Sequence, residues 1–346
     1  MNRSLTVFSI LFFGFLITIV NFSMNSFGSN ETPTPAASFY GRRLAEKKLI
    51  RGAEKEFDVT MISQTSSDRL FYLKYIKERW IGNIAIAVYC PEEKRQMIEE
   101  TLSLLQLPSR VKIILHIPKD PKIYPINLLR NIAIEGIETS HFWVADMDMW
   151  PNWDLYQTLS GLPRKFLADD SLAVIVPSFS YKSYYSINGC LSVLTCALLI
   201  KDEFPATKSE LTHCVNTGNC APFRNESYTH AYHFPGWHTL PATTSLTYKT
   251  PSLPYFDSRF INYGFNKVQW IETLRYSGYK FAVLSQSYAI DIPHPDSHFA
   301  IDWRSQWSLG KVAMKDLYDE YIQKLRNTTD HSVVYICPPA PDARIY

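Results

Sequence analysis

The sequence carries little net charge, little glycine and no internal repeat. The formal net charge is only +2 and 14% of the residues are aromatic, whereas disordered chains carry more charge and fewer aromatic residues. With 13 Gly beside 21 Pro, a collagen-like or low-complexity chain is excluded. The charge balance also lacks the basic excess of nucleic-acid binders, so we expect no nucleic-acid partner.

The sequence has a single long uncharged run, between Arg3 and Glu31. A polytopic membrane protein needs several such runs and is therefore excluded. Its apolar part, residues 5–23, is just long enough to cross a bilayer, which takes at least about 17 residues. The nearby positive charges precede it, so the positive-inside bias keeps residues 1–4 in the cytosol and the rest across the membrane. The pattern predicts a signal-anchor transmembrane helix, with a cleaved signal peptide ending near Gly28 as the alternative.

The six cysteines include no C-x-x-C pair, which makes zinc a poor interpretation. In an oxidising compartment an even number of cysteines permits up to three disulfides. The short spacings of Cys190 with Cys196 and of Cys214 with Cys220 suggest local disulfide loops, and free buried thiols are the alternative. Three N-x-S/T sequons agree with the secretory route; they begin at Asn30, Asn225 and Asn327.

Residues 24–56 show no helical or strand period and are predicted as a stem, followed by one folded domain over 57–330 and a tail over 331–346. The domain alternates short β-branched strands with helical patterns, which implies βαβ units and an α/β fold with a mainly parallel central sheet. The expected strands are 57–64, 83–89, 111–117, 141–145, 172–177 and 281–284, and the expected helices are 67–80, 91–105, 126–137, 268–276 and 314–326.

The sharpest local feature is Asp146-Met147-Asp148, directly after the expected strand 141–145. In open α/β sheets, ligands bind outside the carboxyl ends of the strands. Two carboxylates one residue apart can both reach a divalent cation there, and oxygen ligands suit Mg²⁺ or Mn²⁺, which keep positions free for substrate phosphates. From the pattern alone, a metal–diphosphate site and a solvated turn remain equal alternatives.

Five segments follow one another along the chain: DVTMISQTSSDRL at 58–70, YPINLLRNIA at 124–133, FWVADMD at 142–148, YFDSRFINYGFNK at 255–267 and YAIDIPHPDS at 288–297. In this order they resemble glycosyltransferase family 49, the LARGE-type and β-1,4-glucuronyltransferase-like enzymes. The resemblance covers roughly 57–330. It implies a GT-A fold, an inverting reaction, a UDP-sugar donor and a Mn²⁺ or Mg²⁺ ion at the D-x-D.

The resemblance also implies the metal ligands. Asp146 and Asp148 match the metal-binding pair, with one expected to coordinate directly and the other to reach ribose or water. The family tail usually reads I-H-x-P-H, and His294 matches its second histidine, whereas Asp291 replaces the first. Because aspartate can also bind Mn²⁺, we expect a metal site with altered affinity; a weak or inactive protein is the alternative.

Four further residues are expected at the donor nucleotide through the same resemblance. Arg130 and Asn131 match the L-R-N helix of the family, and Asp68 and Arg69 match its D-R-L segment. An arginine in this place can donate two parallel hydrogen bonds to oxygens of the sugar donor or to a D-x-D carboxylate. The structural alternatives are an ion pair on the helix surface for Arg130 and a capping or surface role for Asp68 and Arg69.

Inversion by single displacement requires a general base that deprotonates the acceptor hydroxyl. Asp257 in the F-D-S-R-F segment matches the aspartate of the family's Y-D-x-R-F pattern and is the candidate base. A salt bridge to Arg259 or a turn cap is the alternative role of this carboxylate.

Residues 221–256 are rich in aromatic residues and histidine and show no clear period. We expect acceptor binding there, because aromatic faces stack on sugar rings while polar groups orient hydroxyls. A zinc site lacks the usual Cys or H-E-x-x-H context. The residues singled out are His230, His233, Trp237 and His238.

The sequence as a whole predicts a single-pass type II enzyme of the Golgi membrane with its catalytic domain in the lumen. The expected reaction transfers glucuronic acid from UDP-glucuronate in β linkage to a glycan acceptor on a glycoprotein or glycolipid. UDP-N-acetylglucosamine as donor, or a catalytically inactive glycan-binding relative, are the alternatives, and a homodimer is left open.

Overall fold

The computed structural model describes residues 7–12, 15–20, 57–182, 190–223, 231–234, 238–241, 245–309 and 314–329. Its strands are β1 (Val7–Phe12), β2 (Phe15–Val20), β3 (Val59–Thr65), β4 (Asn83–Tyr89), β5 (Val111–His116), β6 (His141–Val144), β7 (Met149–Pro151), β8 (Leu172–Ile175), β9 (Ser178–Tyr181), β10 (Cys220–Pro222), β11 (Ala231–Phe234), β12 (His238–Pro241), β13 (Ser245–Tyr248), β14 (Lys280–Leu284) and β15 (Ala289–Asp291). Its helices are η1 (Ser67–Tyr72), α2 (Leu73–Arg79), η2 (Glu92–Lys94), α3 (Arg95–Leu104), α4 (Ile126–Glu135), α5 (Leu155–Ser160), α6 (Arg164–Leu167), α8 (Val193–Ile200), α9 (Lys208–Asn216), α10 (Asn266–Tyr276), α11 (His298–Ser308) and α12 (Lys315–Thr328).

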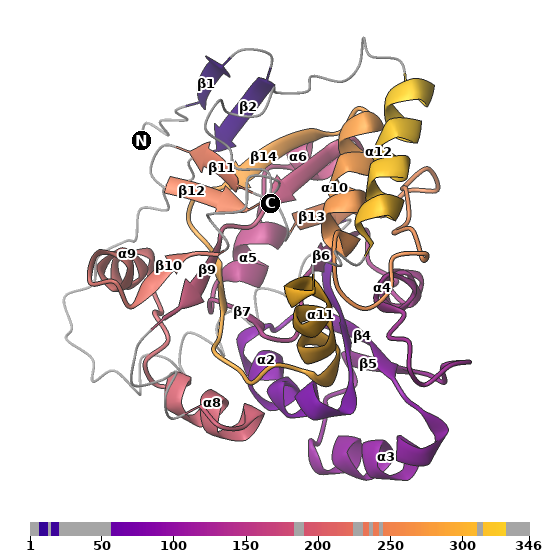
Figure 1. The fold of residues 1–346 in the computed structure, drawn as a ribbon. Helices are drawn as coiled ribbons and strands as arrows, with labels where there is room; N and C mark the ends of the chain where they lie inside the picture. Colours follow the sequence, from indigo (N-terminus) through magenta and orange to yellow (C-terminus); the bar gives the residue numbers. More distant parts are fainter. Residues whose placement is uncertain are drawn as a thin grey trace, which may run out of the picture.

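A nine-stranded sheet in the order β1-β2-β14-β8-β13-β6-β3-β4-β5 forms the centre of this mixed α/β fold (Figure 1). Strands β6, β3, β4 and β5 pair in parallel, as the βαβ pattern predicts. After its exposed first residue, β4 is buried throughout, which explains its nearly continuous apolar sequence. Helix α4 packs against β3 and β4. Strand β14 also pairs in parallel with β2 and β8, so the expected mainly parallel central sheet is confirmed.

Strand β13 departs from the expected pattern, because it pairs antiparallel with both β6 and β8. It lies within residues 221–256, where the sequence shows no period. A second sheet, in the order β10-β9-β15-β7, was not expected either. Strands of three or four residues carry too few alternations to reveal a period, and their pairing is set by tertiary contacts.

Much of the aromatic content packs the core. Four tryptophans are almost fully buried, and the rings of two of them, Trp80 and Trp143, stack at a centroid distance of 5.3 Å. The other two are Trp150 and Trp270. Burying such large side chains supplies much of the hydrophobic stabilisation of a domain.

The amino-terminal run differs from the helix predicted over 5–23. The structure has the strands β1 and β2 there, paired with each other antiparallel, and β2 pairs in parallel with β14. Their sequences, VFSILF and FLITIV, are rich in β-branched and aromatic residues, which favour strands, and hydropathy alone does not separate an apolar helix from apolar strands. Of the helices that the structure describes, none has the length and apolar character needed to cross a membrane.

The two short cysteine spacings form the expected local loops. Disulfides join Cys190 to Cys196 and Cys214 to Cys220. These four sulfur atoms are therefore not available to a zinc ion. Cys90 is a buried free thiol, whereas Cys337 lies outside the described residues.

A buried histidine makes the stability of this fold depend on pH. Burial lowers the pKa of His141, at the start of β6, from 6.5 to about 4. The unfolded chain therefore binds a proton at a higher pH than the folded chain, so stability falls as the pH decreases from 6.5 towards 4. We expect this histidine to reduce the free energy of unfolding by about 2 kcal/mol at pH 5 relative to pH 7.

Urea unfolding of wild type and His141→Gln at both pH values measures this contribution. The variant should lose less stability than wild type between pH 7 and pH 5. His298→Gln, at a position whose side chain is exposed, is the control and should behave like wild type. Equal losses in wild type and His141→Gln would show that His141 does not carry the pH dependence.

Candidate active site

The candidate site begins where two neighbouring parallel strands end. Because β3 and β6 pair in parallel, the segments that follow them lie side by side. The backbone N–H of Ala145 donates to the carbonyl of Ile62 at 3.1 Å and continues the pairing up to the D-x-D. Helix η1 follows β3, and its Arg69 reaches across to form an ion pair with Asp148.

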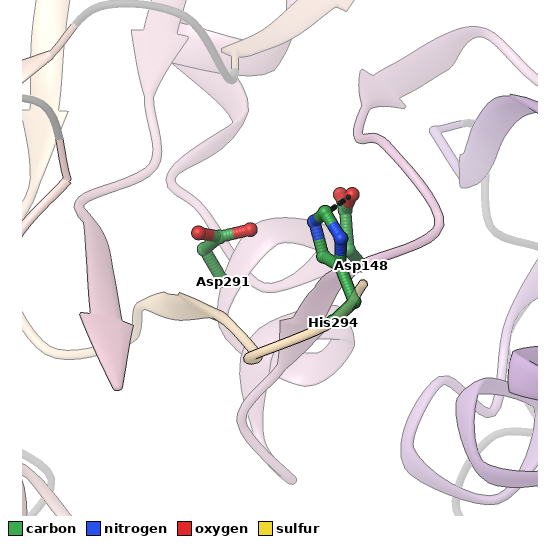
Figure 2. Close-up of side chains that lie close together, drawn as sticks. All are labelled: Asp148, Asp291 and His294. Carbon is green, nitrogen blue, oxygen red and sulfur yellow. Dashed lines mark ion pairs between the residues drawn. The ribbon is translucent and has the colours of Figure 1, made fainter. Parts of the chain in front are cut away.

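A second strand pair brings the carboxyl-terminal part of the chain to the same place. Strand β7 starts directly after Asp148, and β15 ends at Asp291; the two strands pair antiparallel with Asp291 opposite Met149. The backbone N–H of Ile292 donates to the carbonyl of Asp148 at 3.0 Å. This pairing places Asp148, Asp291 and His294 together, with one potential ligand atom from each within 4.8 Å of the others (Figure 2).

These three side chains offer a donor set that fits Mn²⁺ or Mg²⁺: two carboxylate oxygens and one imidazole nitrogen. The Nδ1 atom of His294 lies 2.8 Å from the carbonyl oxygen of Pro295, and its Nε2 atom lies 3.0 Å from Oδ2 of Asp148. A proton on Nδ1 that is donated to this carbonyl fixes the ring and leaves Nε2 for a metal. Asp291, in place of the expected histidine, therefore lies where a third ligand is needed.

The charges of Asp148, His294 and Arg69 shift one another's pKa values. Burial alone would raise the pKa of Asp148, but the positive charge of Arg69 and the hydrogen bond from His294 outweigh it and hold this pKa well below its usual range. Burial alone would lower the pKa of His294, but the hydrogen bond and charge of Asp148 raise it above its ordinary value. Asp148 is therefore an ionised carboxylate, as metal binding requires.

The other D-x-D carboxylate, Asp146, is held by two cations. Its Oδ1 accepts a hydrogen bond from Arg130 at 3.1 Å, and its Oδ2 accepts one from Lys267 at 2.6 Å. Burial would raise the pKa of Asp146, but Lys267 and Arg130 hold it well below its usual range. The D-x-D is thus divided, with Asp148 in the candidate metal cluster and Asp146 bound to cations.

Arg130 is a buried residue, so the alternative of an ion pair on the helix surface does not hold. Its side chain is only 2% exposed, and it also donates to the side-chain oxygens of Asn127 at 2.9 Å and Asn266 at 3.0 Å. Sequence reasoning missed Lys267, although it ends the motif at 255–267, because nothing in the pattern separates a site lysine from a surface lysine.

Asp257 lies in a loop that α4 holds in place. Asn131 donates to the carbonyl of Phe256 at 2.8 Å and accepts from its N–H at 3.0 Å, while Asn127 donates to the carbonyl of Asp257 at 3.0 Å. The carboxylate itself forms an ion pair with Arg259 at 2.6 Å and accepts from the N–H of Arg259 at 3.0 Å. This is the geometry of the structural alternative, a salt bridge and turn cap.

The pKa of Asp257 reflects the same contacts. Burial acts to raise this pKa, but the hydrogen bonds and charge of Arg259 lower it below its ordinary value. These contacts do not join Asp257 to the cluster of Asp148, Asp291 and His294, so its role as the base stays a prediction.

The structure says little about the other residues that the sequence singles out for the donor and acceptor sites. Asp68 accepts a hydrogen bond from the hydroxyl of Ser66 beside the start of η1, which is a local side-chain contact. His230 and Trp237 lie outside the described residues. His233 and His238 lie on the paired strands β11 and β12. The acceptor site expected in this part of the chain therefore stays a prediction.

Comparison with known proteins decides the family. A family model described as "Glycosyl-transferase for dystroglycan", glycosyltransferase family 49, matches residues 117–292. The chain belongs to this family. The family and the enzyme class expected from the sequence are thereby confirmed. The matched range includes Arg130, both D-x-D carboxylates, Asp257 and Asp291, whereas Arg69 and His294 lie outside it.

Curated relatives of this family 49 chain are much longer. The xylosyl- and glucuronyltransferase LARGE1 of Mus musculus is 30% identical over 283 residues, which cover 78% of this chain and 35% of that protein. The xylosyl- and glucuronyltransferase LARGE2 of the same organism is 28% identical over 286 residues, which cover 78% and 39%. The chain therefore spans little more than a third of the length of these relatives.

Among solved structures, S. aureus TarS 1-349 matches with a TM-score of 0.39 and 14% sequence identity over 68% of this chain and 60% of that chain. A likeness as loose as this does not bear on the site.

Proposed function

We propose that this chain is an inverting, metal-dependent glycosyltransferase with a GT-A fold. It takes a UDP-sugar, with UDP-glucuronate as the first choice, and transfers the sugar in β linkage to a glycan on a glycoprotein or glycolipid. The observation that carries the proposal is the convergence of Asp148, between β6 and β7, with Asp291 and His294 at the end of β15. Membership of the family and the names of the relatives support the choice of donor.

In this mechanism Asp148, Asp291 and His294 would hold Mn²⁺ or Mg²⁺. The ion, when bound, neutralises the diphosphate of the donor and stabilises UDP as the leaving group. Arg130 and Lys267 keep Asp146 ionised and fixed, so that it could orient ribose or water. Arg69 carries a fork of N–H donors that suits diphosphate oxygens.

Asp257 remains the proposed general base for the acceptor hydroxyl. Asp257→Asn should fold and bind UDP normally while transfer to the acceptor falls about 100-fold. General acid–base catalysis contributes roughly 10²–10⁴-fold, and the lowered pKa of Asp257 makes it a weak base, which places the loss at the lower end. Transfer rates and UDP affinity are measured side by side.

Arg259→Met is the matched control, because it removes the salt bridge but keeps the carboxylate. It should retain most of the transfer activity. If Asp257→Asn turns over like wild type, the carboxylate has only the structural role.

We propose that residues 57–330 lie in the lumen of the Golgi, where an oxidising compartment permits the two disulfides. Protease treatment of intact microsomes should leave this domain uncleaved until detergent is added. Cleavage without detergent contradicts this part of the proposal.

A donor screen of the full-length chain tests the central proposal. UDP-glucuronate, UDP-xylose and UDP-N-acetylglucosamine are compared with and without Mn²⁺, and UDP release is the readout. An active enzyme should release UDP slowly even without acceptor, fastest from UDP-glucuronate and only with the metal. No release from any donor favours the inactive glycan-binding relative.

A further inference from the structure

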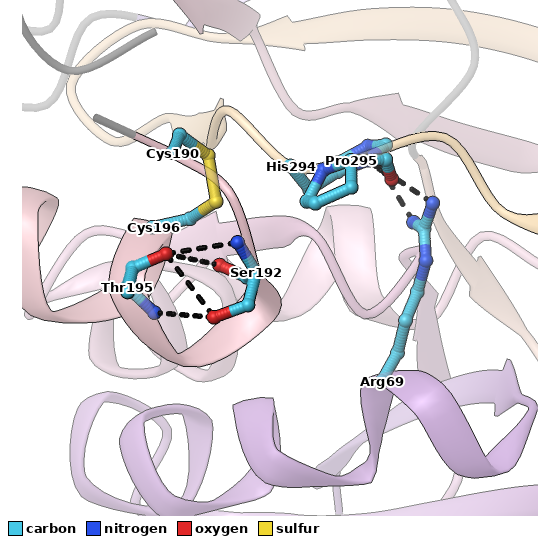
Figure 3. Close-up of a disulfide and its surroundings, with 7 residues drawn as sticks. All are labelled: Arg69, Cys190, Ser192, Thr195, Cys196, His294 and Pro295. Atoms are coloured by element: carbon cyan, nitrogen blue, oxygen red, sulfur yellow. Dashed lines mark hydrogen bonds between the residues drawn. A yellow bond between two sulfur atoms is a disulfide. The ribbon is translucent and has the colours of Figure 1, made fainter. Parts of the chain in front are cut away.

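Arg69 occupies an unusual position for a residue expected at the donor nucleotide. It comes from η1, and its guanidinium contacts two of the three side chains of the candidate metal cluster, Asp148 and His294. Figure 3 shows the guanidinium beside His294. Nη1 forms the ion pair with Oδ2 of Asp148 and lies 3.5 Å from Nε2 of His294, while Nη2 lies 3.1 Å from Nδ1 of His294. These are the same carboxylate and imidazole groups that a divalent cation would bind.

The Oδ2 atom of Asp148, which pairs with Arg69, cannot serve both cations at once. A divalent ion on Asp148 and His294 needs their lone pairs, and it repels a guanidinium held at hydrogen-bond distance in a partly buried site. The other two cations of the site are arranged differently, because Arg130 and Lys267 hydrogen-bond Asp146 instead. They can stay in place when a metal binds, whereas Arg69 has to move.

We propose that Arg69 is a positioning residue that links metal binding to donor binding. Without metal, its guanidinium neutralises Asp148 and keeps Asp148 and His294 together. Metal binding releases the guanidinium, which then turns to the donor diphosphate beside it. The inference rests on the proposed function, since it requires that the cluster binds a divalent cation and that UDP binds next to it.

The position of Arg69 in the fold supports this exchange. The residue lies on the turn after β3, next to the D-x-D that follows β6, at the carboxyl ends of parallel strands where ligands of α/β folds bind. From this edge of the sheet, the long side chain of Arg69 can reach either the metal cluster or the donor diphosphate by changing its rotamer alone. Its planar fork of donors fits a diphosphate as well as it fits a carboxylate.

Such an exchange has a thermodynamic consequence. Metal binding without donor must displace Arg69 from its ion pair, which weakens metal binding. A donor diphosphate that accepts the released guanidinium recovers this loss, so Mn²⁺ and UDP should strengthen each other's binding. By linkage, the strengthening factor is the same whichever ligand binds first.

Calorimetric titration of the full-length protein tests the proposal with Mn²⁺ alone, with UDP alone, and with each in the presence of the other. In wild type, UDP should increase Mn²⁺ affinity by about 10-fold or more, within the usual range of coupling between sites. Arg69→Met should bind Mn²⁺ alone about 10-fold more tightly than wild type, because nothing competes for Asp148. Its coupling between UDP and Mn²⁺ should be about 10-fold smaller than that of wild type, and the coupling that remains comes from direct contact between the metal and the diphosphate.

Arg69→Lys provides a second variant in case the methionine variant does not fold, as judged by its melting profile. It keeps a positive charge but loses the fork, so its Mn²⁺ affinity should lie between those of wild type and Arg69→Met. Arg95→Met, which removes an exposed arginine paired with Glu99, is the control and should match wild type.

The outcomes separate this inference from the proposed function. If the Arg69 variants bind Mn²⁺ no more tightly than wild type and keep its coupling to UDP, the exchange is wrong while the metal site stands. If neither wild type nor any variant takes up Mn²⁺, with or without UDP, both the exchange and the metal-dependent function are wrong.

Discussion

Asp148→Asn should lower Mn²⁺-dependent UDP release about 10³-fold or more. Asp148 is the D-x-D carboxylate that joins Asp291 and His294, and it is ionised because Arg69 and His294 hold its pKa well below the usual range. A neutral amide is a much poorer ligand for Mn²⁺ than a carboxylate. Since a bound metal supplies several kcal/mol of transition-state stabilisation, its loss corresponds to a reduction of this size.

The measurement is steady-state UDP release over a range of Mn²⁺ concentrations, together with a melting profile to show that the variant is folded. The amide introduced by Asp148→Asn keeps the volume of the carboxylate and one oxygen that can accept a hydrogen bond from Arg69. Asp319→Asn, at an exposed position on α12, is the matched control and should leave turnover unchanged. Turnover of Asp148→Asn within 10-fold of wild type would remove this carboxylate from the metal site.

Asp291→Asn repeats the test on the other side of the cluster (Figure 2). The same loss of metal-dependent turnover is expected, because Asp291 takes the place of the histidine that the resemblance leads one to expect. Asp291→His should restore a nitrogen ligand and retain activity. An inactive Asp291→His combined with a fully active Asp291→Asn would show that this position does not bind the metal.

Arg130→Met should lower the free energy of unfolding by about 3 kcal/mol or more. The arginine is 2% exposed and binds Asp146, Asn127 and Asn266, so its removal leaves one oxygen of a partly buried carboxylate and two amide oxygens without this donor. Removing one partner of a buried ion pair costs roughly 3–5 kcal/mol, and the lower end applies because Lys267 still binds Asp146.

Chemical denaturation monitored by tryptophan fluorescence measures this loss. Arg95→Met is again suitable as the control, since a half-exposed ion pair contributes about 1 kcal/mol or less. Arg130→Lys should give an intermediate loss, because a lysine keeps the charge but cannot reach all three acceptors. A loss below about 1 kcal/mol in Arg130→Met would mean that the network adds little to stability.

Particular segments show how far the sequence alone could predict the fold. The sequence predicts the strands β4 and β5 and the helix α4 within two residues at each end, because the strands are short apolar runs and the helix has a clear apolar period. The strands β7 and β15 were missed, because three residues cannot show a period. The amino-terminal run was predicted as a helix from hydropathy, whereas the structure has strands there.

In the candidate site, too, the sequence predicts some features and leaves others to the tertiary structure. The motif pattern points to Asp148, His294 and Arg130, and Asp291 departs from the pattern of the family. The motif pattern could not show that Asp291 would lie against Asp148, since that contact depends on the pairing of β7 with β15. It also missed Lys267, whose contact with Asp146 is made across 121 positions of the chain.

The sequence by itself determined the α/β class, the family and the D-x-D at the end of a buried strand, because each of these depends on local patterns. It favoured the two local disulfide loops, and the structure confirms them. Only the tertiary structure decided how the two D-x-D carboxylates divide their roles. Asp148 turns to the cluster with Asp291 and His294, while Asp146 is bound by Arg130 and Lys267. The physical reason is that the electrostatic environment of a carboxylate is set by charges from distant segments, which meet only when the sheets form.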